Sequence, residues 1–126
     1  MSKIKVHATL QNITEKTEHI IETTGIYRDN IITYSDENVL MSLKMEKESI
    51  HMKRIQNEDV LDCIFISPLT TTGIYDIKSV NITFDIKIQT KKLIIQENKI
   101  EIAYEMALAE EPSKKFNYEL EYEVIP

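Results

Sequence analysis

The chain has 126 residues, of which 42% are hydrophobic and 29% charged, a size and balance that predict one globular domain and exclude intrinsic disorder. Its 15 Lys and Arg against 21 Asp and Glu give a net charge of −6, and division after Cys63 leaves 8 − 11 = −3 and 7 − 10 = −3 in the two parts. Neither part has the excess of positive charge that binds phosphates, so we expect no nucleic-acid partner and no anionic membrane partner.

Three further features predict a cytoplasmic protein. The sequence begins Met1-Ser2-Lys3-Ile4-Lys5 and continues as alternating residues, without the apolar stretch of a signal peptide. The longest apolar runs, such as Cys63–Ile66, fall far short of the roughly 20 residues that a transmembrane helix needs. Cys63 has no second cysteine to pair with, which fits a reducing compartment.

Apolar and polar residues alternate along most of the chain, which predicts strands. The pattern is plainest in Phe116–Val124, where aromatic and aliphatic residues alternate with Asn117 and three glutamates. An excess of isoleucine over leucine, 21 to 8, also favours strands because β-branched side chains pack well on a pleated surface. In chain order the predicted strands are Ile4–Leu10, His19–Tyr27, Ile31–Ser35, Val39–Met45, Ile50–Gln56, Val60–Ser67, Gly73–Lys78, Val80–Gln96, Ile100–Leu108 and Phe116–Val124.

Two segments depart from simple alternation. In Val80–Gln96 the apolar residues shift from even to odd positions, which predicts a bulge near Thr90 and Lys91 in one long, bent strand. Asn12–Glu22 is polar enough to contain one helical turn. No stretch of ten or more residues has the i, i+3, i+4, i+7 spacing of an amphipathic helix, so we expect little helix.

Short polar segments such as Arg28–Asn30 and Asp36–Asn38 separate the strands and predict hairpin turns. The two glycines, Gly25 and Gly73, each lie in the sequence Thr-Thr-Gly-Ile-Tyr. Nothing around this repeat is itself repeated, so we expect it to be coincidental. A glycine inside a strand marks a kink, and kinks let a sheet bend into a barrel.

Charge predicts where the sheet closes. The outward face of the first strand carries Lys3, Lys5 and His7, and that of the last strand carries Glu119, Glu121 and Glu123. Opposite charges on neighbouring strands attract, so we expect these two strands to pair. The sequence therefore predicts an all-β fold, a single antiparallel up-and-down β-barrel of about 8–10 strands that occupies residues 1–126.

Several segments occur in an order that resembles a known family: Thr24–Tyr27, then Ile32–Ser35, then Ile88-Gln89-Thr90-Lys91 leading to Ile100–Met106. With these segments the chain resembles the YwiB-like bacterial proteins, a family of domains of unknown function. The resemblance implies a bacterial protein with a lipocalin-like (calycin-like) β-barrel. It supplies no catalytic residues, and its link to ligand carriers is one of shape.

Residues able to carry out chemistry are scattered. His7, His19 and His51 lack metal-ligand spacing, and none lies near Cys63, which has no neighbouring base to form a thiolate. No glycine-rich phosphate loop and no Gly-x-Ser-x-Gly motif is present. We expect no enzyme activity, no cofactor and no metal.

An acidic ladder on the last strand is the one alternative. Glu119, Glu121 and Glu123, together with Glu101 or Glu105, leave open a divalent-cation site. A solvated face paired with lysines is the reading we prefer.

The remaining candidates for a site lie on the predicted inward faces. Soft or hydroxyl-bearing side chains there suit an apolar ligand with one polar group: Met41, Met45, Phe84, Tyr104, Met106, Tyr118 and Tyr122. A barrel of about eight strands is either filled by its own side chains or holds one small ligand, so a solid core and a cavity both stay open.

Two functions follow from this pattern. The first is non-enzymatic binding of a small apolar or amphipathic ligand in the barrel interior. The alternative is a protein-interaction or structural module that acts through its surface, with a protein partner or as a homodimer.

Overall fold

Ten antiparallel strands and no helix make up the computed structural model, which describes residues 1–126. The strands are β1 (Ser2–Asn12), β2 (Thr17–Arg28), β3 (Ile31–Asp36), β4 (Val39–Met45), β5 (Ser49–Gln56), β6 (Asp59–Ile66), β7 (Thr70–Ile77), β8 (Ile82–Gln96), β9 (Lys99–Leu108) and β10 (Lys114–Val124). Every predicted strand is present, and the polar segment after Asn12 forms a β-turn connection without a helical turn. The structure has no helix of the length and apolarity needed to span a membrane.

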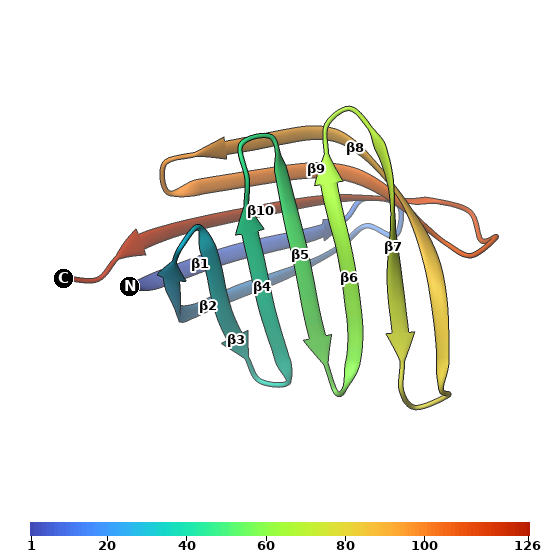
Figure 1. Ribbon diagram of the computed structural model, residues 1–126, viewed down its shortest axis with the longest axis horizontal. Helices are drawn as coiled ribbons and strands as arrows, with labels where there is room; N and C mark the ends of the chain where they lie inside the picture. Colours follow the sequence, from blue (N-terminus) through green and yellow to red (C-terminus); the bar gives the residue numbers. More distant parts are fainter.

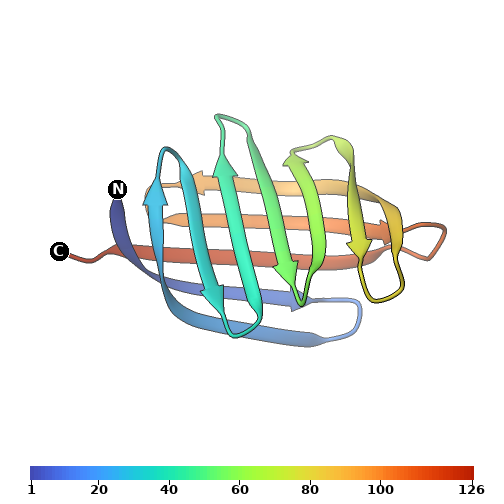
Figure 2. The ribbon, with the colours of Figure 1, turned by 60° about the horizontal axis from the view of Figure 1, so that its bottom comes forward.

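The strands form one closed barrel in which each pairs with its neighbours in sequence, and β1 pairs with β10 to complete the ring. The barrel is flattened into two layers: β3–β7 cross steeply over β1, β2, β9 and β10 (Figures 1 and 2). The long strand β8 bends from one layer to the other, and its pairing with β9 shifts register between Thr90 and Lys92. The predicted barrel and the predicted bulge are both confirmed.

Closure is made by main-chain pairing from Ile4 opposite Val124 to Asn12 opposite Phe116. The predicted pairing of the first and last strands is therefore confirmed, but its electrostatic reason is wrong in detail. Lys5 faces Glu123 without forming an ion pair, and the Nδ1 atom of His7 lies 3.0 Å from Glu22 on β2. Long exposed side chains gain little from such contacts in water, so backbone pairing determines the register.

The glutamates of β9 that face the last strand also find cations elsewhere. Glu101 lies beside Glu119 in register, and it pairs with Lys92 of β8 at 3.4 Å. Glu105 pairs with Lys91 at 3.4 Å. These carboxylates thus belong to a solvated face neutralised by lysines.

The two Thr-Thr-Gly-Ile-Tyr segments occupy equivalent corners of the barrel. An added Cβ on Gly25 would lie 2.5 Å from the Thr33 carbonyl oxygen, and one on Gly73 would lie 2.5 Å from the Asp62 carbonyl oxygen. Two residues before each glycine, a threonine hydroxyl donates to a carbonyl across the corner. Thr23 donates to Ser35 at 3.0 Å, and Thr71 donates to Ile64 at 2.5 Å.

The two segments therefore have the same structural role in the barrel. Each glycine lets two strands approach closely where the sheet bends, and each threonine hydroxyl satisfies a carbonyl where the ladder opens. The first copy lies on β2 and its partner β3 follows it, whereas the second lies on β7 and its partner β6 precedes it. The order of glycine strand and partner strand is reversed between the two copies, which is not the arrangement of a tandem duplication.

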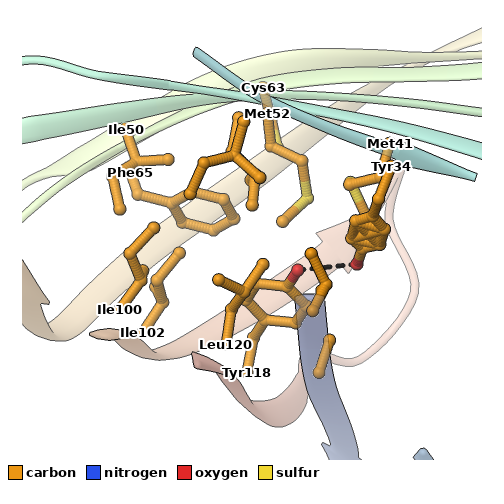
Figure 3. Packing of buried hydrophobic residues seen from close by; sticks show 14 of the residues in the cluster. Tyr34, Met41, Ile50, Met52, Cys63, Phe65, Ile100, Ile102, Tyr118 and Leu120 are labelled. Atoms are coloured by element: carbon orange, nitrogen blue, oxygen red, sulfur yellow. Dashed lines mark hydrogen bonds between the residues drawn. The ribbon is translucent and has the colours of Figure 1, made fainter. Parts of the chain in front are cut away.

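The core fills the space between the two layers. It contains 19 buried apolar residues, and among the largest that are fully enclosed are Phe65, Leu43, Ile50, Ile100 and Leu120. They come from both layers, and Figure 3 shows those of β5 and β6 facing those of β9 and β10. The middle of the barrel is therefore packed with side chains, and partly buried apolar residues remain toward its two open ends.

Candidate functional site

One row of inward-facing residues crosses six adjacent strands near one open end of the barrel. The register places Tyr34, Met41, Arg54, Leu61, Tyr75 and Phe84 side by side from β3 to β8. We call this set the Arg54 row. It lies two residues inside the turns that join β3 to β4 and β5 to β6, at the lower side of Figure 1.

Arg54 is the cation of this row and is half-buried. Its Nη2 donates to the Gln56 side-chain oxygen at 2.7 Å. No Asp or Glu oxygen lies within ion-pair distance of the guanidinium. A partly desolvated charge is stabilised by a counter-ion. Because Arg54 has none, its guanidinium is able to bind an anion.

Aromatic residues of β9 and β10 pack across the interior against the other layer. The ring of Tyr104 packs 4.7 Å from that of Phe65 and 5.3 Å from that of Phe116, measured between centroids. The hydroxyl oxygens of Tyr34 and Tyr118 are 2.7 Å apart and buried, which links β3 to β10 (Figure 3). A hydrogen-bonded hydroxyl pair is thus enclosed by apolar and aromatic side chains.

Burial raises the pKa of all three enclosed tyrosines, Tyr34, Tyr104 and Tyr118, because the charged phenolate would lose its water. The positive charge of Arg54 acts in the opposite direction on the pKa of Tyr34 and on that of Tyr104. At neutral pH the three hydroxyls are therefore protonated and able to donate hydrogen bonds.

A further polar group faces inward beside Tyr104. Thr90 is fully buried and directly opposite Tyr104 in the β8–β9 register. Its Oγ1 has no hydrogen-bond partner, although its main-chain N–H donates to the Leu69 carbonyl at 3.2 Å. Buried hydroxyls normally have a hydrogen-bond partner, so the Thr90 hydroxyl is an exception inside the barrel.

The opposite open end has a hollow of about 450 Å³. Its wall includes Tyr27, Met45, Ile95 and Tyr122, and the rings of Tyr27 and Tyr122 stack with centroids 5.7 Å apart. Glu46, Lys47 and Glu97 are among its polar lining residues. This end is therefore amphipathic, but its polar groups lie at an exposed turn instead of inside the barrel.

Two larger hollows on the outer surface are lined in part by titratable residues. The larger, of about 820 Å³, is lined largely by polar residues, among them Lys5, His7, Glu22 and Glu123. The other, of about 510 Å³, is next to Cys63 and contains the pair His51 and Asp62, whose Nε2 and Oδ1 atoms are 2.5 Å apart.

Neither outer hollow contains a reactive centre. Burial raises the pKa of the Cys63 thiol to about 12, so the thiol stays protonated and unreactive at neutral pH. No group of three or more His, Cys, Asp or Glu side chains converges in a way that would hold a metal ion.

The seven residues predicted to contact a ligand in the barrel interior do not form one site in the structure. Met41, Tyr104 and Tyr118 are buried in the core. Met106 packs partly buried against the core, and Phe84 is half-buried at the end of the Arg54 row. Met45 and Tyr122 line the hollow at the opposite end.

The sequence analysis missed Arg54, Tyr34 and Thr90. Arg54 continues the inward series of Ile50 and Met52 at the two-residue period, and this was the signal that could have revealed it. Tyr34 and Thr90 also continue apolar series in their strands. What the pattern does not contain is the hydrogen bond to Tyr118 or the missing partner of Thr90.

No protein-family model matches the sequence, and no curated protein matches it. Among solved structures, the fold is similar to the crystal structure of the ywiB protein from Bacillus subtilis, with a TM-score of 0.71. The match covers 99% of this chain and 93% of that chain at 17% sequence identity. The resemblance to the YwiB-like proteins is confirmed at the level of fold.

Proposed function

We propose that the protein binds a small amphipathic molecule without catalysis, at the open end of the barrel that carries the Arg54 row. The observation that carries this proposal is the enclosed set of polar groups among apolar side chains. Tyr34 and Tyr118 supply buried hydroxyls, and Met41 and Phe116 supply apolar surface near them. Binding sites for small molecules combine a mostly apolar lining with a few fixed polar groups.

The packed middle of the barrel limits how far a ligand enters. The core residues between the layers fill the centre, so the ligand would occupy the end and not pass through the barrel. Partly buried residues that pack against the core are available there, including Leu10, Leu61, Tyr75, Leu108 and Phe116. Their incomplete burial supports a surface that an alkyl or aryl group would cover.

A non-catalytic role agrees with the chemistry of the site. Its hydroxyls are held protonated, its thiol neighbour Cys63 is buried, and it lacks a paired acid and base. As part of the same proposal we place the protein in the cytoplasm, where a lone thiol such as Cys63 stays reduced.

The chain contains no tryptophan, so one introduced tryptophan reports on its own surroundings. We would replace Tyr75, in the Arg54 row, by tryptophan and titrate the variant with decanoate and with 1-decanol. Tyr27→Trp, at the opposite end, is the matched control. A saturable one-to-one change in Tyr75→Trp, with a weaker or absent change in Tyr27→Trp, supports the proposal.

Two results would contradict it. If neither amphiphile gives a saturable change in either variant, the binding function is rejected. If Tyr27→Trp alone responds, the site lies in the 450 Å³ hollow and not at the Arg54 row.

Interaction through the outer surface is the second candidate function. The outer hollow of about 820 Å³ presents Lys5 and His7 between the acidic residues Glu22, Glu121 and Glu123, a mixed charge pattern suited to a protein surface. Light scattering after size exclusion tests the homodimer directly. A mass of one 14.7 kDa chain at all concentrations would remove self-association.

A further inference from the structure

The positive charge of Arg54 indicates which chemical class of ligand the barrel end would bind. This inference rests on the proposed binding function. Across β3 to β8 the row presents methionine, leucine and aromatic side chains on both sides of Arg54. An arginine at such a position loses part of its hydration. Without an anionic partner the charge lowers the stability of the folded chain, and a ligand that brought a negative charge would recover that loss.

The nearest carboxylates by register lie outside this row. Asp36 and Asp59 belong to the next inward-facing row, at the rim of the barrel end. Asp59 accepts a hydrogen bond from the main-chain N–H of Lys78 at 2.9 Å and is occupied by it. Neither aspartate forms an ion pair with Arg54.

Arg54 is the hydrogen-bond donor of this row. Its guanidinium has several N–H groups, and Gln56 accepts from one nitrogen, Nη2. Tyr34, two strands away in the same row, shares a hydrogen bond with Tyr118. The remaining N–H groups of the cation match a group that is negatively charged and only accepts hydrogen bonds.

We infer that Arg54 binds the carboxylate head group of an amphipathic ligand, whose apolar part covers the half-buried residues at the same end of the barrel. The planar guanidinium and a planar carboxylate form two parallel N–H···O bonds, a geometry that an alcohol or amide head group does not match. The ligand class is therefore a monocarboxylate with an alkyl or aryl tail.

The test compares two probes of equal chain length, decanoate and 1-decanol, by isothermal titration calorimetry. The wild-type chain is expected to bind decanoate about 10- to 100-fold more tightly than 1-decanol, the range of one charge-assisted interaction. Arg54→Met keeps an unbranched apolar stem and removes the charge. It is expected to lose that preference, so that its affinities for the two probes differ by less than about threefold.

Two further variants separate charge from shape. Arg54→Lys keeps the charge without the planar fork, so its preference for decanoate falls between those of wild type and Arg54→Met. Asp36→Asn removes the rim carboxylate and is expected to tighten decanoate binding at low salt without changing 1-decanol binding. Far-UV circular dichroism and urea unfolding confirm that each variant is folded.

The outcomes distinguish the two proposals. Equal affinity of the wild type for decanoate and 1-decanol, or an unchanged preference in folded Arg54→Met, overturns the inference and leaves the binding function standing. If the wild type binds neither probe, the binding function itself fails.

Discussion

Tyr34 and Tyr118 meet inside the barrel through their hydroxyl groups, although 84 residues separate them in the sequence. Both side chains are almost fully buried. Each hydroxyl therefore depends on the other to replace the water it has lost, and the pair connects the two layers at the end that carries the proposed site.

Removing one hydroxyl of this pair leaves the other buried without a partner. We expect Tyr34→Phe and Tyr118→Phe each to lower the free energy of unfolding by about 1–3 kcal/mol. The double variant should lose clearly less than the sum, because it leaves no unpaired hydroxyl. Urea unfolding of the four proteins measures the coupling; additive losses would show that the hydrogen bond contributes nothing of its own.

The buried thiol predicts a loss of stability in alkali. Burial raises the pKa of Cys63 from 9.0 to about 12, so between these values the unfolded chain releases a proton that the folded chain keeps. This contribution to stability is present below pH 9 and is lost as the pH rises through the folded pKa. The slope from this group approaches about 1.4 kcal/mol per pH unit.

Urea unfolding at several pH values between 8 and 10 measures this slope. Cys63→Val is the matched control, since it replaces the thiol by an apolar group of similar size and removes the titration. A slope that is the same in the wild type and in Cys63→Val would exclude the thiol as its source.

Individual residues show where sequence reasoning ends. The buried positions of Met41, Tyr104 and Tyr118 follow from two-residue alternation, and Arg54 could have been placed on the inner face by the same rule. Alternation does not say which inward side chains meet across the barrel. The contact of Tyr34 with Tyr118 depends on how the two layers cross, which a single strand's pattern does not contain.

At the scale of strands, the two glycine corners determine how the sheet folds back on itself. Each glycine has a main-chain oxygen where its side chain would begin, and each is followed by an isoleucine and a tyrosine on alternate faces. Neither glycine has a positive φ, so their importance lies in close approach and not in backbone conformation.

We expect Gly25→Ala and Gly73→Ala to lower the free energy of unfolding by about 1–3 kcal/mol or more, because the added methyl would press on main-chain atoms that have little room to move. Thr24→Ala and Thr72→Ala, which change the exposed neighbour on the same strand, are the matched controls and should stay within about 0.5 kcal/mol of wild type. Thermal and urea unfolding measure all four; equal losses in both pairs would contradict the close-approach explanation.

Strands and the bulge were predictable because both are local properties of the apolar pattern. The pattern also gave the polar turns, many of which place Asn or Asp at positive φ, such as Asn30, Asn57 and Asn98. The corners were not predictable. A threonine that satisfies a carbonyl on the neighbouring strand looks the same in sequence as any other strand threonine.

At the scale of the whole molecule, the pairing of β1 with β10 brings the chain termini to the same side of the barrel (Figure 1). A short connection between them would leave every strand pair unchanged. The fold therefore does not require the chain to be open between β10 and β1.

We expect a circular permutant to fold into the same barrel when Met1 and Pro126 are joined by a short Gly/Ser linker and the chain is opened between Asn57 and Glu58, in the β5–β6 turn. Its far-UV circular dichroism should match that of the wild type, and urea unfolding should remain a single transition. Opening the chain within β10, for example between Leu120 and Glu121, should prevent folding.

The barrel as a whole was predictable because ten alternating strands with tight turns have few arrangements that hide every edge. Charge gave the right pair of closing strands although the expected ion pairs do not form. The proposed function was not accessible in the same way, since it depends on an arginine without an ion pair and on two hydroxyls that meet only in three dimensions.

The seam between β1 and β10 also affects how the protein is made. During translation the N-terminal strand leaves the ribosome first and has β2 as a partner on one side, while its other side stays open until the final strand emerges. While β2 to β9 are being synthesised, the nascent chain therefore exposes a strand that other polypeptides could join. Ribosome-bound chains that stop before Lys114 should need chaperones, and release of the last strand should end that need.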